Sequence, residues 1–481
     1  MLKLFIQNNM KLYFVNLILV IILISTSFIV LNHNDFHYYG STVISGQLYK
    51  DIYFYYPPVS FIFNKAISLL FPSEYNYLLM RISSISFFIL SINILANSFL
   101  KTNEDKIYFL LFTSLLCSSG ALEIGSYTLS FLFFTLSLGK FFFGKNNKDF
   151  FLAGLFFGLC LSTRSTYAYC VLFFLVIILK DKNCKNYFLY STLGGILGIL
   201  PYAFFFLKDF NSVIFWNFEY HLLLNEAGRW RGLWAFVKSI IAQMYFSFYI
   251  VLTPLLLPYL YYLFKDIHKR FFEFMLLTTL AASSLATLVS NPQYFEPLFT
   301  ILLLFIIKYI KRGYLSRFLI ISLIIISSGR FLYKYKNLDI SKYSDKNIGS
   351  IFSIYNTKEK IQSVIDNNFK EECNLVFRTT SPIFLPHALT HHPFNLQGAW
   401  LFRLKELKEK MLLQSNKIYD YNNYLNFYKE DFNVLLVGFY GLGGMSGNYK
   451  LELINYAEKE NWKLFDITHF KLYIKNECIK K

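Results

Sequence analysis

The chain has 481 residues, of which 55% are apolar and only 16% charged. A soluble protein of this length carries more charge on its surface, so the excess apolar surface must face lipid. The formal net charge is +17, but the Lys and Arg residues fall mainly in short clusters between apolar runs, as the positive-inside bias predicts. The composition therefore indicates an α-helical polytopic membrane protein, and the basic charge is explained by topology and not by nucleic acid.

Apolar runs predict about eleven membrane spans, because a helix of about 20 residues crosses the hydrocarbon core of a bilayer. The first run, "YFVNLILVIILISTSFIVL", has the length of a retained membrane anchor. The predicted spans cover about residues 13–31, 77–100, 107–121, 127–143, 150–163, 165–180, 187–207, 237–264, 271–290, 297–310 and 316–333.

Basic residues at the ends of these runs predict the orientation of the chain. Clusters such as Lys140, Lys145 and Lys148 all fall on one side of the membrane, which we expect to be the cytoplasm. The N-terminus lies on the same side, and an odd number of spans places everything after about residue 333 outside the cytoplasm. We expect the protein in the inner membrane.

Residues 334–481 have a different character from the rest of the chain. They alternate apolar segments such as "FNVLLVGFY" and "FKLYIK" with helix-like stretches such as "KLELINYAEKEN". The sequence predicts two domains, a membrane domain over 1–333 and a small extracytoplasmic α/β domain over 334–481. Cys373 and Cys478 lie in this second part, where a disulfide can form, but their spacing leaves the pairing open.

The first outer loop carries the most informative polar residues. Asp35 follows the first span by about four residues, and ionisable residues at the membrane surface are candidates for function. The alternative is a solvated loop carboxylate. His33, Asp35 and His37 alternate and would share one face of an extended segment, which allows a divalent cation but supports it weakly. We therefore predict no metal site and no required cofactor.

The same loop carries a resemblance to a known family. The segment "DFHYYGSTVISGQLYKDIYFYYPPV" (35–59) resembles the first outer loop of the GT-C superfamily of integral-membrane glycosyltransferases. Further along the chain, "AGLFFGLCLSTRSTYAYCVLF" is similar to the family's Gly-rich span with its following basic residue, and "NPQYFEPLF" is similar to a late turn of the family. The closing "NWKLFDITHFKLYIK" resembles the strand pair that often ends such chains.

The resemblance implies transfer of a sugar from a polyprenyl-phosphate donor to a lipid-linked or cell-envelope acceptor, with inversion. Asp35 would be the base that removes the proton of the acceptor hydroxyl. One carboxylate is enough, because phosphate is a good leaving group and needs no acid to protonate it. Tyr49, Asp51, Pro57 and Pro58 would shape the pocket.

The leaving phosphate needs positive charge beside it. Arg164, at the outer end of a predicted span, and Arg81, near the start of another, are the candidates; the alternative for both is an interaction with lipid headgroups. Several relatives have a Lys directly before Pro-Pro, where this chain has Tyr56. Either Lys50 or Lys65 supplies that charge, or the donor is held differently.

Three further residues are predicted to contact substrate. They are Glu123 in the second outer turn, for which simple loop exposure is the alternative, His221 in the large outer loop and Tyr294 in the late turn. Other functions also stay open. A polysaccharide polymerase or ligase would use similar donors, a transporter would carry ionisable residues in mid-span, and an envelope assembly protein could keep the fold without catalysis.

Overall fold

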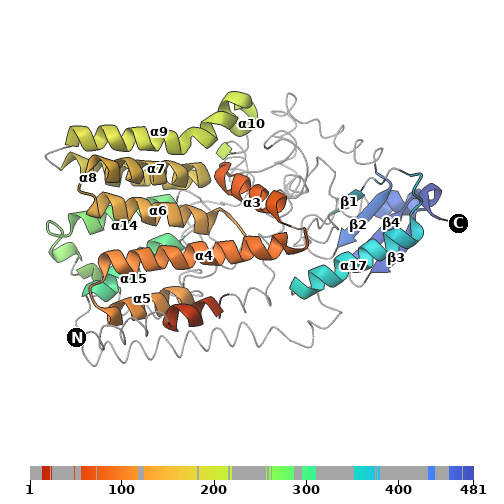
Figure 1. Ribbon diagram of the computed structural model, residues 1–481, viewed down its shortest axis with the longest axis horizontal. Helices are drawn as coiled ribbons and strands as arrows, with labels where there is room; N and C mark the ends of the chain where they lie inside the picture. The colour runs from red at the N-terminus through yellow and green to blue at the C-terminus, as the bar shows by residue number, and fades with distance from the viewer. Residues whose placement is uncertain are drawn as a thin grey trace, which may run out of the picture.

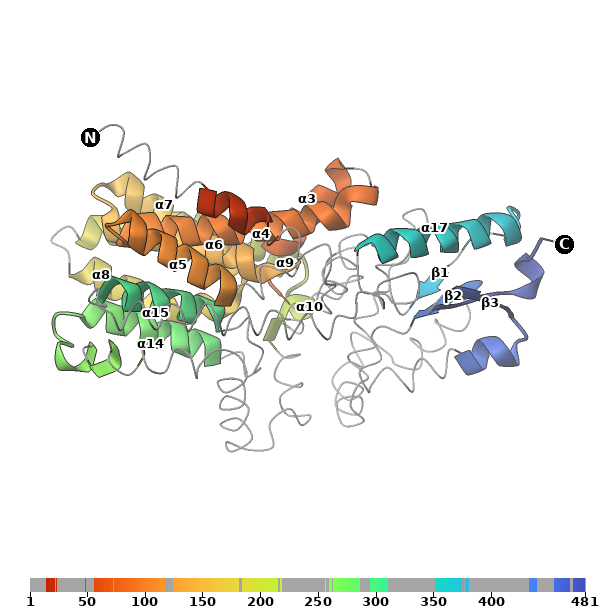
Figure 2. The ribbon, with the colours of Figure 1, turned by 90° about the horizontal axis from the view of Figure 1, so that it is seen from below.

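The computed structural model describes most of the helices and part of the C-terminal region. The residues it describes are 14–21, 23, 48, 56–71, 73–116, 124–180, 184–214, 217–218, 256, 259–261, 263–285, 295–309, 351–373, 375, 377–379, 432–438, 454–467 and 470–480. Helices run side by side along the long axis of the molecule, and a sheet lies beyond one end of them (Figures 1 and 2).

The helices follow the predicted spans closely. They are α4 (Ser73–Phe99), α5 (Asn103–Leu116), α6 (Ser126–Phe143), α7 (Asn147–Thr163), the 3-10 helix η2 (Ser165–Tyr169) continued by α8 (Cys170–Leu179), α9 (Cys184–Lys208), α14 (Phe271–Leu285) and α15 (Glu296–Tyr309). Among the described residues, three segments are long and apolar enough to cross a membrane, namely Tyr75–Phe99, Ser126–Phe143 and Cys184–Lys208. The predicted span at 316–333 and most of that at 237–264 fall outside the described residues, so the count of eleven stays a prediction.

Two short helices were not predicted from the sequence. Helix α3 (Val59–Leu70) follows the Pro-Pro pair, and α10 (Phe210–Ile214) follows α9. Both lie at the end of the long helices that faces the sheet (Figures 1 and 2). This end also holds the first residue of α4 and the last residue of α9, so it is the end predicted to lie outside the cytoplasm.

Helices α7 and α9 cross at very short distance because both present glycine there. A Cβ atom at Gly154 would lie 1.9 Å from the carbonyl oxygen of Ser191, and one at Gly194 would lie 2.0 Å from that of Phe151. Gly158 and Gly198 complete a Gly-x-x-x-Gly spacing on each helix, which is typical of close helix contacts in membranes. Glycine is required at this crossing.

Polar side chains join the helices inside the bundle. The amides of Asn16 and Asn93 donate to each other at 3.1 and 2.9 Å. The hydroxyl of Ser162 on α7 donates to the carbonyl oxygen of Gly198 on α9 at 2.9 Å. Buried polar groups in a membrane need such partners, so these hydrogen bonds fix which helix faces meet.

Cationic side chains lie at the opposite end of the bundle from α3. Lys140 at the end of α6 pairs with Asp149 at the start of α7, 2.8 Å apart. Lys308 at the end of α15 lies 3.4 Å from Glu273 in the first turn of α14. Lys180 after α8 lies over the ring of Phe271, 4.3 Å from its centre. These basic residues were predicted to lie on one side of the membrane. In the structure they lie together at one end of the helices.

The C-terminal region contains a four-stranded sheet with strand order β1-β2-β4-β3. Its strands are β1 (Phe377–Thr379), β2 (Val434–Gly438), β3 (Lys463–Ile467) and β4 (Phe470–Ile474). Strands β1 and β2 are parallel, and the other pairs are antiparallel. Helix α17 (Ile351–Asn368) lies on one face and the helix of residues 454–459 on the other (Figure 2). The predicted boundary at 333/334 falls outside the described residues.

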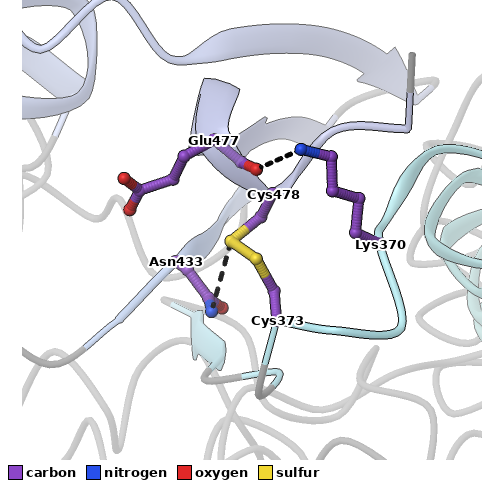
Figure 3. Close-up of a disulfide and its surroundings, with 5 residues drawn as sticks. All are labelled: Lys370, Cys373, Asn433, Glu477 and Cys478. Atoms are coloured by element: carbon purple, nitrogen blue, oxygen red, sulfur yellow. Dashed lines mark hydrogen bonds between the residues drawn. A yellow bond between two sulfur atoms is a disulfide. The ribbon is translucent and has the colours of Figure 1, made fainter.

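A disulfide joins Cys373, just after α17, to Cys478 in the closing 3-10 turn η9 (Asn476–Cys478), as Figure 3 shows. The two Cα atoms are 5.7 Å apart, within the usual range for a disulfide. Lys370 reinforces the junction, because its Nζ donates to the carbonyl oxygen of Glu477 at 2.8 Å. The pairing that the sequence left open is therefore present in the structure.

Candidate functional site

The Tyr-Pro-Pro turn is held in place by the start of α3. Pro58 is the residue that caps α3, and both Pro57 and Pro58 are buried. Proline suits a helix start, because its fixed φ is already helical and its missing N–H would have no partner there. Helix α3 is in turn fixed to α4, because the Asn76 amide donates to the carbonyl oxygen of Ser68 at 3.3 Å. The turn therefore has a rigid base.

Arg164 lies between α7 and η2. It is the C-cap residue of α7 and has an extended backbone (φ −157°, ψ 108°). Its backbone N–H donates to the carbonyl oxygen of Cys160 at 2.8 Å. Its side chain is only 4% exposed. The guanidinium carbon lies over the ring of Tyr127, 4.3 Å from its centre. Such a cation on an aromatic face is stabilised by about 0.5–2 kcal/mol, more when it is shielded from water.

Tyr127 connects Arg164 with the Tyr-Pro-Pro turn. It lies in the first turn of α6, and its hydroxyl oxygen is 3.5 Å from that of Tyr56. Helix η2, which follows Arg164, is joined to α14. The hydroxyl of Ser283 on α14 donates to the carbonyl oxygen of Thr166 in η2 at 2.7 Å. A cationic group and the predicted donor-binding turn thus meet at one end of the helices.

Arg81 lies on α4 and is fully buried. Its Nη1 donates to the hydroxyl of Tyr77 at 3.4 Å, and its guanidinium carbon is 5.8 Å from the centre of the Tyr77 ring. An arginine buried within a membrane domain is costly and commonly serves function. The contacts described for Arg81 tie it to its own helix, whereas Arg164 reaches across to another.

Lys65 on α3 is half-buried, and loss of hydration lowers the pKa of its ammonium group below the ordinary value. Desolvation disfavours the charged form, and a bound anion would offset that effect. Lys65 was one of two residues predicted to replace the Lys that relatives have before Pro-Pro. The other, Lys50, lies outside the described residues.

Six predicted site residues also lie outside the part of the chain that the structure describes: Asp35, Tyr49, Asp51, Glu123, His221 and Tyr294. Within the described ranges, His, Cys, Asp and Glu form no group of three that could hold a metal ion. Sequence reasoning missed Tyr127 and Tyr77, although both are tyrosines within a helical turn or two of the outer end of a span.

A crevice opens beside Tyr127, between α4, α6 and α15. It has about 260 Å³ of empty space, including the part open to solvent. Its apolar wall consists of Phe88, Phe131 and Pro297. Its polar lining, besides Tyr127, consists of Thr128, Glu296 and Thr300. The crevice and the Arg164 guanidinium therefore share Tyr127 as a common wall.

The arrangement of the helices and the C-terminal sheet is also found in solved structures. Crystal structures of ArnT from Cupriavidus metallidurans share it, at 10% sequence identity. The structure bound to undecaprenyl phosphate aligns with a TM-score of 0.58 over 97% of both chains. The apo structure aligns with a TM-score of 0.54 over 97% of this chain and 98% of that one. The sequence matches no protein-family model and no curated protein. The likeness shows that this chain shares the fold of ArnT.

Proposed function

We propose that this protein is a glycosyltransferase that moves a sugar from a polyprenyl-phosphate donor to a lipid-linked or cell-envelope acceptor. The reaction takes place at the outer face of the inner membrane and inverts the anomeric centre. The observation that carries the proposal is the buried Arg164 guanidinium on the Tyr127 ring, beside the Tyr-Pro-Pro turn. The fold that surrounds it is shared with a protein crystallised with undecaprenyl phosphate.

The reaction exchanges one bond at the anomeric carbon for another. The bond from that carbon to the phosphate oxygen breaks, and its electron pair leaves with the polyprenyl phosphate. The acceptor oxygen bonds to the same carbon from the opposite face, and its proton passes to the Asp35 carboxylate. Tyr49 and Asp51 line the pocket with the Pro57-Pro58 turn, and contacts to the substrates come from three further residues: Glu123, His221 and Tyr294.

Arg164 and Arg81 neutralise the phosphate as negative charge develops on it. A planar guanidinium can donate two parallel hydrogen bonds to phosphate oxygens, and charge-assisted hydrogen bonds are about twice as strong as neutral ones. Both side chains are almost completely buried, so water competes little with the phosphate for them. Lys65, on the helix that follows the Pro-Pro turn, supplies the charge that relatives take from a Lys before Pro-Pro.

Two observations support an outer location for the site. Lys140, Lys180 and Lys308 lie at the helix ends away from α3, which is the cytoplasmic end by the positive-inside bias. The Cys373–Cys478 disulfide lies in the C-terminal region, and disulfides form and persist mainly in oxidising compartments. We therefore place α3, the crevice and the sheet outside the cytoplasm.

Binding and release of the lipid phosphate test this proposal. Purified protein in nanodiscs is titrated with undecaprenyl phosphate, and its melting temperature is followed for wild type, Arg164→Gln and Lys148→Gln. Lys148 is an exposed cation at the other end of α7, so it is the matched control. We expect stabilisation of wild type and Lys148→Gln, and at least about a tenfold weaker apparent affinity for Arg164→Gln.

The same nanodiscs, with envelope lipid extract, are then given a panel of polyprenyl-phosphate sugars, and the release of lipid phosphate is measured. No binding and no release of lipid phosphate by wild type would overturn the proposal.

A further inference from the structure

The crevice beside Tyr127 contains two buried hydroxyl groups that lack hydrogen-bond partners. Thr300 on α15 is completely buried and Thr128 on α6 is 4% exposed, and neither hydroxyl has a partner within the part of the chain that the structure describes. Thr163 and Thr279 instead donate to a carbonyl of the preceding turn, at 2.7 Å to Leu159 and 2.9 Å to Met275, whereas Thr113 on α5 also lacks a partner among the described residues but does not line the crevice. A buried hydroxyl without a partner costs about 1–3 kcal/mol. Two such hydroxyls in one crevice can receive a polar group that enters from outside.

The shape and lining of the crevice indicate which group that is. The space in it that a water-sized group can occupy is about that of one such group. Glu296, the first residue of α15, adds a carboxylate to the polar lining, while Phe88 and Phe131 form the apolar wall. Hydroxyls and a carboxylate recognise sugar hydroxyl groups, and an apolar aromatic wall suits the C–H face of a sugar ring. The ligand chemistry is therefore that of a sugar with its hydroxyl groups.

The position of the crevice indicates which sugar. Tyr127 lines the crevice and also carries the Arg164 guanidinium on its ring, 4.3 Å away. A donor whose phosphate lies at Arg164 would bring its own sugar, one bond further on, to the crevice side of Tyr127. We propose that the crevice binds a hydroxyl group of the donor sugar, and that Thr128, Thr300 and Glu296 determine which donor is accepted. This inference rests on the proposed function.

Removal of the two hydroxyls tests the inference. Thr128→Val and Thr300→Val, singly and together, keep the side-chain shape and should leave stability unchanged or raised, because the hydroxyls have no partner to lose among the residues that the structure describes. Thr135→Val is the matched control, since Thr135 is a buried threonine on α6 whose hydroxyl already donates to Leu132 at 2.9 Å. Release of polyprenyl phosphate is measured for a donor and for its deoxy analogues at each ring position.

Wild type and Thr135→Val should prefer the complete donor over one deoxy analogue by about tenfold or more, because the analogue leaves a buried hydroxyl unsatisfied. In the double valine variant this preference should fall below about threefold. An unchanged preference, or a change only in the KM for the acceptor, would overturn the donor subsite. Absence of release by wild type from every donor would instead overturn the proposed function, and the subsite with it.

Discussion

The guanidinium carbon of Arg164 lies 4.3 Å from the centre of the Tyr127 ring, so the residue that caps the end of α7 is held by the first turn of α6. The Tyr127 hydroxyl lies 3.5 Å from that of Tyr56, directly before the Pro-Pro pair. Tyr127 is thus a positioning residue. It orients the cation that we assign to the donor phosphate and relates it to the turn that begins α3.

Substitution of Tyr127 should separate the role of the ring from that of the hydroxyl. Tyr127→Leu removes the aromatic face, and we expect the donor KM to rise about 2- to 30-fold, the equivalent of about 0.5–2 kcal/mol. Tyr127→Phe keeps the ring and should stay within about threefold of wild type. Steady-state kinetics with varied donor concentration measure both. Equal losses in the two variants would show that the ring does not position Arg164.

Arg164→Lys keeps the charge but loses the planar pair of donors. We expect kcat/KM for the donor to fall about tenfold or more, because a lysine binds phosphate as a point charge. The acceptor KM should be unchanged. A lysine variant with wild-type kcat/KM would show that charge alone, and not the guanidinium geometry, is needed at this position.

Two adjacent glycines of α9 should respond oppositely to alanine. At Gly194 a Cβ atom would lie 2.0 Å from the carbonyl oxygen of Phe151, so Gly194→Ala must separate α7 from α9, at a cost of about 1–3 kcal/mol or more. At Gly195 the nearest atom is 3.8 Å away, and alanine should be tolerated or slightly stabilising. Melting temperatures in detergent compare the two variants. Equal melting temperatures would contradict the close crossing.

The disulfide should stabilise the C-terminal region. Cys373→Ser and Cys478→Ser each remove the same bond, and we expect each to cost about 2–5 kcal/mol, with the double variant no worse than either. Limited proteolysis of membranes should cut the variants faster than wild type. Maleimide labelling of denatured protein gives a second measure, since prior reduction should expose two additional thiols. An unchanged thiol count on reduction would show that the pair is not oxidised.

Positions of the helices could be predicted from the sequence, but their contacts could not. The apolar runs at 150–163 and 165–180 gave α7 and the η2–α8 pair, because a lone Arg164 between them marks a membrane surface. Hydropathy does not report which faces meet. The Gly-rich character of α7 was visible in the sequence, yet only the structure shows that its glycines meet those of α9.

Some residues of the candidate site could likewise be predicted from the sequence, and others could not. Arg81 and Arg164 could be found from the sequence, because charged residues stand out in apolar spans. Tyr127 could not, since tyrosine is abundant in this chain, with 37 copies, and its role depends on a contact between distant segments. Thr128 and Thr300 are ordinary residues for a membrane helix, and what distinguishes them is a shared crevice in which their hydroxyls have no partner among the described residues.

Release of free polyprenyl phosphate by wild type and by Asp35→Asn tests the central claim most directly. Both are assayed in membranes with a panel of polyprenyl-phosphate sugars and envelope lipid extract, at matched expression, with the exposed Glu372→Gln as the control carboxylate. We predict release by wild type and by Glu372→Gln, and a loss of about a hundredfold or more in Asp35→Asn, because the acceptor then has no base. Equal release by wild type and Asp35→Asn would contradict the assignment of the base, and no release from any donor would contradict the glycosyltransferase itself.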